Sequence, residues 1–307
     1  QPESIFCYFI LGWCEDDTGV KRVQCMNDLP IILAFIEDLL TAVRIDNVAQ
    51  ELGFQFVHWE KTGNGSQVEN EIPRRQWAEP LQGIEAAVID RITSYQPALI
   101  IFDLGNRSIP SLEWIALVTS VPATRGIPVL AYGPHVDKEK LLAAEAAGAN
   151  LSVARSKLMN HLPDMLSENA RVVDRAAIMA TCEDNLPHLA KRGLDEFNRG
   201  EYFKAHDSLE LAWMADHTAG RDLYRAILQV AVAYYQIERG NYNGAAKMFL
   251  RMRKWLAPLP DTCRGINIHK LRMDVEAVHT ELTELGPERI EGFDLELLKP
   301  VEYKVIY

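Results

Sequence analysis

Three features that would assign a class at once are missing from this sequence of 307 residues. No apolar run approaches the roughly 18 residues that a membrane-spanning helix needs. Basic residues do not dominate, since 32 Lys and Arg face 43 Asp and Glu and leave a formal net charge of −11. That balance argues against a broad electrostatic grip on nucleic acid or on an anionic membrane. The length is sufficient for two ordinary domains, each with its own core.

Cysteine is scarce and forms no recognisable pattern. None of the cysteines stands in a Cys-x-x-Cys pair, and none stands at metal-ligand spacing from a histidine. The five positions are Cys7, Cys14, Cys25, Cys182 and Cys263. We therefore expect reduced thiols in a cytoplasmic protein.

The first 25 residues match no folded element. The stretch SIFCYFILGW is too short for a membrane helix and lacks the basic flank of a signal peptide, and CEDDTGVKRVQC is polar without helical or strand periodicity. An apolar strand follows shortly after Met26. We expect Met26 to be the native start, and residues 1–25 to be non-native sequence or a poorly ordered arm.

Apolar runs alternate with helix-length segments from about residue 28 to residue 167. The five runs are IILAFI, FQFVHW, PALIIFDLG, IPVLAYG and NLSVAR. Continuous apolar strands separated by helices are typical of a parallel sheet that is covered on both faces. We predict a doubly wound, flavodoxin-like α/β domain over residues 26–167. A polar loop, KTGNGSQVENEIPRRQWAEP, separates its second strand from its second helix.

Polar residues follow these strands at the edge where such a sheet binds ligands. Glu37 and Asp38 follow the first strand, Asp103 ends the third, Gly133 ends the fourth and Arg155 follows the fifth. Three converging carboxylates repel one another unless a cation or a proton intervenes, and oxygen ligands suit Mg²⁺. The sequence therefore predicts a Mg²⁺ site formed by Glu37, Asp38 and Asp103.

This half resembles the receiver domain of response regulators along its whole length. FIEDLLTAVRI matches the acidic-pair motif, LIIFDLG matches the strand that ends in the phospho-acceptor aspartate, and AAGAN matches the turn before the last strand. The resemblance implies a Mg²⁺-dependent phosphorylation of Asp103, with Glu37 and Asp38 helping to hold the metal.

Four positions depart from the receiver pattern. The hydroxyl residue expected after the fourth strand is Gly133, the aromatic switch residue is Ser152, and the phosphate-binding lysine is Arg155, followed by Ser156 rather than proline. Without the hydroxyl the switch is uncoupled from a phosphoryl group, which favours a pseudo-receiver. A working phospho-receiver and solvated carboxylates without a role are the alternatives. His135, on the loop after the fourth strand, is either a crevice ligand or base or a solvated side chain.

After residue 167 the apolar pattern changes to a period of 3.6 residues. We predict a helical linker over 168–185, an all-α bundle over 186–290, and a tail over 291–307 that lies back over a domain. Gly200 and Gly240 are expected to end helices. The predicted helices cover 187–198, 201–216, 220–239, 243–257 and 269–284.

The helical half contains the pattern Arg-Gly-x-Tyr-x-x-Ala twice, but only the first copy continues into a polar stripe. Tyr202, His206 and Glu210 share one helical face, and Arg225 and Gln229 form a second line on the next helix. One interpretation is a buried hydrogen-bonded network of all five, because an unpaired buried polar group costs about 1 to 3 kcal/mol. The other is a ligand or metal site built on His206 and Glu210.

This region closely resembles the bacterial domain-of-unknown-function family 309. The match covers about residues 190–260 and rests on EFNRGEYFKAHDSLELAW, YRAILQVAVAYY and RGNYNGAAKMF. Asp207 stands where the family tends to have glutamate. The resemblance implies a compact all-α fold and no particular biochemical role.

The favoured function is a regulatory or adaptor protein of bacterial signalling, in which a degenerate receiver is joined to a helical domain that binds a protein partner or a small ligand. The alternatives are an acid-base or metal-dependent enzyme that uses His206 and Glu210, and a working phospho-receiver of a two-component system. We expect a protein partner, allow a homo-oligomer, and expect no membrane. Nucleic-acid binding is least favoured, because the basic residues of the fourth predicted helix are expected to form a solvated face. These residues are Lys247, Arg251, Arg253 and Lys254.

Overall fold

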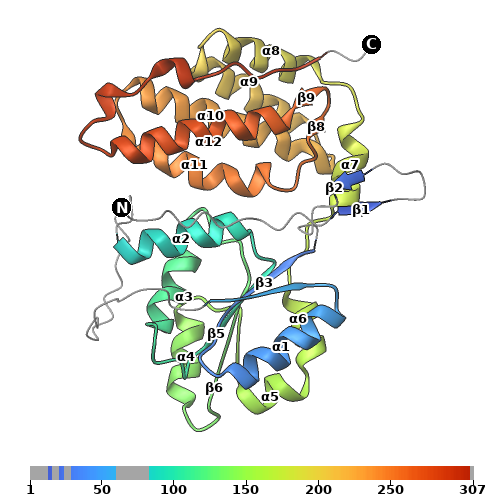
Figure 1. The fold of residues 1–307 in the computed structure, drawn as a ribbon, viewed down its shortest axis with the longest axis vertical. Coiled ribbons are helices and arrows are strands. Elements are labelled where there is room, and N and C mark those ends of the chain that lie inside the picture. Colours follow the sequence, from blue (N-terminus) through green and yellow to red (C-terminus); the bar gives the residue numbers. More distant parts are fainter. Residues whose placement is uncertain (1–12, 16–20, 24–28, 60–82, 305–307) are drawn as a thin grey trace.

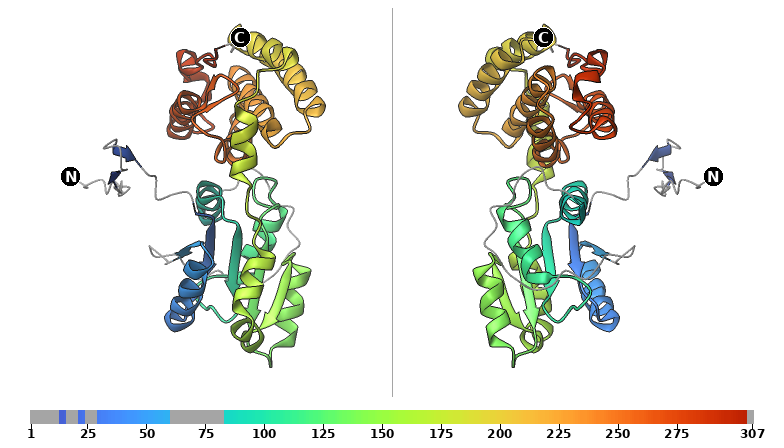
Figure 2. Two further views of the ribbon diagram at one scale, coloured as in Figure 1. Left: turned by 90° about the vertical axis from the view of Figure 1, so that its right-hand side faces the viewer. Right: turned by 90° about the vertical axis from the view of Figure 1, so that its left-hand side faces the viewer.

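The computed structural model describes residues 13–15, 21–23, 29–59 and 83–304. Two domains are stacked one above the other, a sheet domain below and a helical domain above (Figure 1). The side views show α7, Arg175–Cys182, running between them (Figure 2). Within the described ranges, no helix combines the length and the apolar character needed to cross a membrane.

A five-stranded parallel sheet forms the centre of the sheet domain, as predicted. Its strand order, β4-β3-β5-β6-β7, corresponds to 2-1-3-4-5 in the order of this domain's strands, which is the flavodoxin-like doubly wound arrangement. All five predicted strands are present. They are β3 (Ile31–Phe35), β4 (Gln55–His58), β5 (Leu99–Asp103), β6 (Val129–Gly133) and β7 (Leu151–Ala154).

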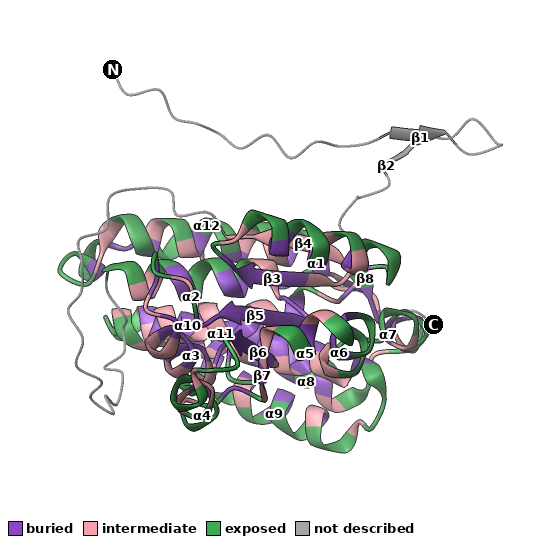
Figure 3. Ribbon diagram, turned by 90° about the horizontal axis from the view of Figure 1, so that it is seen from below, coloured by how far each residue is buried: buried purple, intermediate pink, exposed green. Residues whose placement is uncertain are grey.

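Helices cover both faces of this sheet, so the central strands are almost wholly buried (Figures 1 and 3). Alternate residues point to opposite layers: Leu33 and Phe35 pack in one core cluster, and Ile32 and Ala34 pack in the other. The first layer contains α2 (Gly83–Tyr95), α3 (Ser111–Ser120) and α4 (Lys138–Ala146). The second contains α1 (Leu39–Glu51), α5 (Arg155–Asn160) and α6 (Leu162–Asn169).

The last predicted helix of this domain is divided in two at His161. Pro163 lies in the first turn of α6, where its missing N–H is tolerated. In a continuous helix the same residue would leave the carbonyl of Met159 without its partner, so the chain begins a new helix instead.

The helical domain contains the five predicted helices within a few residues of their expected bounds. They are α8 (His188–Asn198), α9 (Tyr202–Ala215), α10 (Asp222–Glu238), α11 (Tyr242–Leu256) and α12 (Ile268–Leu285). Gly200 and Gly240 have φ angles of 76° and 66°, which fits their predicted place after a helix end. Short 3₁₀ helices and a small hairpin complete the domain: η1 (Ala219–Arg221), η2 (Ile290–Gly292), η3 (Leu295–Leu297), β8 (Thr262–Cys263) and β9 (Ile266–Asn267).

The tail packs back over the helical domain as far as the structure describes it. The Asn198 side chain donates to the Val301 carbonyl at 2.9 Å and accepts from the Val301 N–H at 2.7 Å. The Tyr303 hydroxyl donates to Asp195, and Tyr303 pairs with Ile266 in an isolated β-bridge. These contacts fasten the end of the described chain to α8 and β9.

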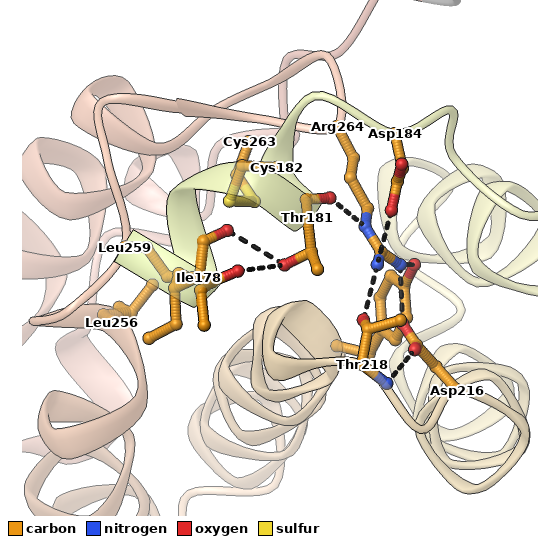
Figure 4. The surroundings of a disulfide bond; sticks show 12 residues. Ile178, Thr181, Cys182, Asp184, Asp216, Thr218, Leu256, Leu259, Cys263 and Arg264 are labelled. Carbon is orange, nitrogen blue, oxygen red and sulfur yellow. Dashed lines mark hydrogen bonds and ion pairs between the residues drawn. A yellow bond between two sulfur atoms is a disulfide. The ribbon is translucent and has the colours of Figure 1, made fainter. Parts of the chain in front are cut away.

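The predicted linker over 168–185 is in part a member of the helical domain. Ile178 and Cys182 of α7 pack in the helical core, and Cys182 forms a disulfide with Cys263 (Figure 4). The expectation of reduced thiols was therefore wrong for these two residues. They are 81 positions apart, and sequence spacing carries no information about two cysteines that only the fold brings together.

The expectation that no element precedes the sheet was also wrong. β1 (Trp13–Glu15) and β2 (Lys21–Val23) pair antiparallel within the polar stretch that showed no periodicity. Met26 and the whole of the predicted polar loop after β4 lie outside the described residues.

The two domains meet where α11 lies against α2 (Figure 1). Nη1 of Arg253 donates to Oδ1 of Asp90 at 2.6 Å and to the Thr93 hydroxyl at 3.0 Å. Leu250 packs against the core of the sheet domain. A cavity of about 260 Å³ lies beside this contact, with Gln96 from the sheet domain among its lining residues. Arg253 is thus an interdomain contact rather than part of the solvated face that was expected.

Reduction of the disulfide should destabilise the helical domain by roughly 2 to 4 kcal/mol, because the bond restricts a long loop in the unfolded chain. Dithiothreitol should lower the melting temperature of the wild-type protein. The double variant Cys182→Ser, Cys263→Ser should melt at the reduced temperature with or without the reagent. Equal lowering of both proteins by dithiothreitol would contradict a stabilising disulfide.

Candidate functional site

Asp103 is the centre of the candidate site at the carboxyl edge of the sheet. Its side chain is buried, and both of its oxygens are already bonded. Oδ1 accepts the Gly105 N–H at 2.8 Å, and Oδ2 accepts Nη2 of Arg155 at 3.1 Å. A Cβ on residue 105 would stand 3.1 Å from Oδ1, so this close approach depends on glycine. Burial raises the pKa of Asp103, and the bonds from Gly105 and Arg155 only partly oppose this effect.

Arg155 lies between the two acidic positions of the crevice. Its Nη2 bonds to Asp103, and its Nη1 lies 3.5 Å from Oδ2 of Asp38. The guanidinium also stands over the ring of Tyr132, 5.5 Å from its centre. Arg155 reaches this place because it is the first residue of α5, directly after β7. One cation from the chain therefore pairs with two carboxylates.

The other two predicted metal ligands have structural partners. Asp38 is the N-cap of α1: Oδ1 accepts the Leu40 N–H at 3.1 Å and Oδ2 accepts the Thr41 hydroxyl at 2.6 Å. The bond from Thr41, more than the charge of Arg155, holds the pKa of Asp38 below its usual value. Glu37 accepts the backbone N–H of Arg107 at 2.8 Å.

These residues do not fit a Mg²⁺ ion in the arrangement observed. Across residues 29–59 and 83–304, no three His, Cys, Asp or Glu side chains are grouped closely enough to hold a metal ion. The predicted set of Glu37, Asp38 and Asp103 fails because Arg155 occupies the space between two of its members and the third bonds to backbone. Repulsion among the carboxylates suggested a metal ion, and the guanidinium of Arg155 reduces this repulsion instead.

The remaining crevice residues offer little chemistry. A Cβ on Gly133 would lie 3.3 Å from Cβ of Leu104, so even a small hydroxyl side chain would require its neighbour to shift. Ser152 lies in β7 with a buried hydroxyl that has no partner among the described residues. His135 is exposed and contacts none of the crevice carboxylates. A cavity of about 300 Å³ borders Glu37 and His58 at the ends of β3 and β4.

The polar stripe of the helical domain does not form the predicted network. His206 bonds through Nδ1 to its neighbour Asp207 at 3.1 Å, and Glu210 is exposed. Tyr202 packs its ring edge-on against Tyr234, with ring centres 5.5 Å apart. Periodicity placed these side chains on one helix face correctly, but it did not show that this face runs from the buried Tyr202 to the exposed Glu210.

The second line of the predicted network is also separate. Arg225 lies over the rings of Trp213 and Trp255, and Oε1 of Gln229 is buried without a partner among the described residues. The prediction of a network over Tyr202, His206, Glu210, Arg225 and Gln229 was therefore wrong in its contacts. Aromatic rings, rather than the stripe on α9, hold Arg225.

A buried arginine that sequence analysis missed organises the end of the helical domain (Figure 4). Arg264 is 3% exposed; Nη1 donates to Oδ2 of Asp216 at 2.6 Å, and Nη2 donates to the Thr218 hydroxyl at 2.9 Å. Nε bonds to the Thr181 carbonyl at 3.1 Å, one residue before the disulfide. In the sequence, the dipeptide Arg264-Gly265 could have indicated the hairpin turn that places this arginine. Both residues have positive φ in the two-residue turn between β8 and β9.

The family comparison agrees with the helical fold. Residues 190–248 match a family model described as "Domain of unknown function (DUF309)". An uncharacterized protein from Aquifex aeolicus (strain VF5) is 29% identical over 91 residues, a match that covers 29% of this chain and 27% of that protein. This chain thus spans about a quarter of the relative's length. The predicted DUF309 assignment is confirmed over residues 190–248.

Solved receiver structures align with the sheet domain at low identity. The phosphorylated cyanobacterial phytochrome response regulator RcpA is 15% identical with a TM-score of 0.34, and the alignment covers 46% of this chain and 94% of that chain. A response regulator from Thermotoga maritima is 16% identical with a TM-score of 0.32, covering 46% and 96%. The Mn²⁺-bound form of response regulator Rcp1 is 13% identical with a TM-score of 0.33, covering 45% and 92%. The receiver-like fold itself rests on the strand order and the two helical layers described above.

Asp103→Asn should leave the melting temperature at pH 7 unchanged or raise it, because the raised pKa of Asp103 means that folding disfavours its charged form. A raised pKa gives stability that is full below about pH 3.8 and is lost as the pH rises through the folded-state pKa. The gap between variant and wild type should therefore close as the pH falls from 7 to 4. Asp38→Asn is the control of opposite sign, since its lowered pKa makes the wild type lose stability as the pH falls. A lower melting temperature of Asp103→Asn at pH 7 would contradict this account.

His206→Ala should change the free energy of unfolding by less than about 0.5 kcal/mol, because the side chain is partly exposed and hydrogen-bonds to an exposed neighbour, Asp207. A buried network would instead lose about 1 to 3 kcal/mol. Urea denaturation of the full chain measures the difference. Leu209→Ala on the same helix, where the leucine is fully buried, should cost about 2 to 5 kcal/mol and shows that the assay reports this domain.

Proposed function

We propose that this chain, a receiver-like domain joined to a DUF309 domain, is a regulatory or adaptor protein of bacterial signalling whose receiver-like domain no longer responds to phosphorylation. One observation carries the proposal: Arg155 bridges Asp103 and Asp38 in place of a metal ion. Phosphoryl transfer to Asp103 needs a free carboxylate oxygen and a cation that coordinates the incoming phosphate. Here both carboxylate oxygens of Asp103 already accept hydrogen bonds, and the cation beside them is the guanidinium of Arg155.

Two further features support a pseudo-receiver. Gly133 supplies no hydroxyl to bind a phosphoryl group, and Leu104 restricts the space in which a hydroxyl side chain would stand. Arginine also presents a planar fork with several donors, whereas lysine presents a compact ammonium. A working Mg²⁺-dependent receiver would require Arg155 to leave both carboxylates before the metal could enter.

A partner-binding role for the helical domain is supported by its surface. Phe203, Leu211 and Met214 are about half exposed or more on α9, at 62%, 50% and 49%. Their spacing of eight and three residues places them along one side of the helix, where His206 and Glu210 provide polar flanks. We propose that this side of α9 contacts a protein partner, and that the sheet domain serves as its scaffold in the cytoplasm.

Asp103 should not form a phosphoryl adduct when the protein is incubated with Mg²⁺ and acetyl phosphate, because both carboxylate oxygens are bonded and the described residues form no group that could hold a metal ion. Intact-mass spectrometry measures the adduct, and size-exclusion chromatography measures the oligomeric state, which should not change.

A receiver known to accept phosphate from the same reagent serves as the positive control. Asp103→Asn identifies any adduct that forms elsewhere on the chain. A stoichiometric adduct that disappears in Asp103→Asn and alters the oligomeric state would overturn the proposal in favour of a working phospho-receiver.

A further inference from the structure

Three cations and two indole rings interleave on one side of the helical domain. Cζ of Arg221 lies 4.4 Å from the ring centre of Trp213. Cζ of Arg225 lies 4.8 Å from the centre of Trp213 and 4.2 Å from that of Trp255, and Nζ of Lys254 lies 4.5 Å from Trp255. Both indoles also pack against the apolar core of this domain, which holds them in place. We call these five residues the arginine–tryptophan cluster.

The cations of this cluster have no carboxylate partner. Within the part of the chain that the structure describes, Arg221, Arg225 and Lys254 form no ion pair, and the same is true of nearby Arg251 and Arg125. By contrast, Arg155, Arg253 and Arg264 are each paired with an acid. In a chain with eleven more acidic than basic residues, a group of unpaired cations is a departure from the general composition.

These charges repel one another across the domain boundary. Burial lowers the pKa of Lys254 first, and the charges of Arg225, Arg125 and Arg251 lower it further, while Asp222 alone opposes them. Arg125 belongs to the sheet domain, in the segment between α3 and β6. The other cations stand on the helical domain, and α11 carries both Lys254 and the Arg253 contact to Asp90. The positive charge is therefore shared by the two domains next to their contact.

The donors in the cluster suit a ligand with several negative oxygens. A guanidinium that lies over an indole keeps the N–H groups at its edge free, and these groups match phosphate oxygens in pairs. Nε1 of Trp213 is buried and has no acceptor among the described residues. Each indole already carries two cations within 5 Å of its ring centre, so its faces are not open for stacking a base. These features favour the phosphates of a ligand over its bases.

We infer that the arginine–tryptophan cluster binds a compact polyvalent phosphate, either a polyphosphate or the phosphate chain of a nucleotide. The bound anion would offset the repulsion among the cations of the cluster and would be attracted further by the charges of Arg125 and Arg251. This inference is independent of the state of Asp103.

Isothermal titration of the full chain with sodium tripolyphosphate at about 150 mM salt tests the site. Wild-type protein should bind it, and Arg225→Gln should weaken binding by about tenfold or more, because it removes a charged donor fork from the centre of the cluster. Arg125→Gln should also weaken binding, although it lies in the other domain. Arg239→Gln is the matched control. Arg239 directly follows α10, the helix that carries Arg225, and lies outside the cluster with its Cζ 5.3 Å from the ring centre of Tyr235. Its loss should not change the affinity.

A melting measurement separates a binding site from a structural cluster. Without any phosphate compound, Lys254→Gln should melt at or above the wild-type temperature, because it relieves repulsion among the cations. If Lys254 instead stabilised the fold, the variant would melt at a lower temperature. Tripolyphosphate should raise the wild-type melting temperature and leave that of Lys254→Gln nearly unchanged.

ATP distinguishes the two sources of phosphate. Equal affinity for ATP and tripolyphosphate assigns the site to a phosphate chain alone, and tighter binding of ATP assigns it to a nucleotide. The inference is overturned if tripolyphosphate does not bind at millimolar concentration, if Arg239→Gln weakens binding as much as Arg225→Gln, or if Lys254→Gln melts below wild type in the absence of ligand. Binding of a single-stranded oligonucleotide that tripolyphosphate fails to displace would also overturn it.

Discussion

The packing of α11 against α2 is the contact on which the arrangement of the whole molecule depends. Arg253 bonds to Asp90 and Thr93, and Leu250 reaches the core of the sheet domain, so one helix belongs to the packing of both domains. The same helix carries Lys254 and Trp255 beside the boundary. A helix repeats its faces every 3.6 residues, so fixing residues 250 and 253 on the sheet domain also fixes the direction in which 254 and 255 point. Docking of the domains therefore fixes the position of the cationic cluster relative to the sheet domain.

Within the sheet domain a comparable constraint is imposed by a single guanidinium. Arg155 pairs with both Asp103 and Asp38, and because it is part of the chain this pairing does not depend on a cofactor. Burial disfavours the charge on Asp103, and the bonds to Gly105 and Arg155 partly compensate for it. The crevice therefore keeps the acidic residues of a receiver while its electrostatics are satisfied internally. That combination is what a domain retained as a scaffold would need.

The elements of this fold follow from local patterns, whereas its sites do not. Apolar runs bounded by breakers predict all five strands, and Gly200 and Gly240 mark helix ends because left-handed backbone favours glycine. By contrast, Cys182 meets Cys263 only because α7 folds onto the β8–β9 hairpin. The failed network has the same cause: a helical period shows which residues share a face, and tertiary packing decides whether that face is buried. Arg225 lies over the indoles of Trp213 and Trp255, which belong to other helices, so the periodicity of its own helix could not indicate this contact.

The α11–α2 contact and the Arg155 bridge together limit where a ligand or a phosphoryl group can regulate this protein. A ligand shifts an equilibrium between two arrangements only if it binds one of them better than the other. A phosphoryl group on Asp103 would have to displace a donor from one of its two bonded oxygens and would find no hydroxyl at Gly133, so the crevice gives it little differential affinity. An anion on the arginine–tryptophan cluster would be held by Arg225 and its neighbours in the helical domain, and the charge of Arg125 in the sheet domain would add to this attraction only while the domains are docked. Of the two sites, the cluster is therefore the better placed to couple a bound ligand to the docking of the domains.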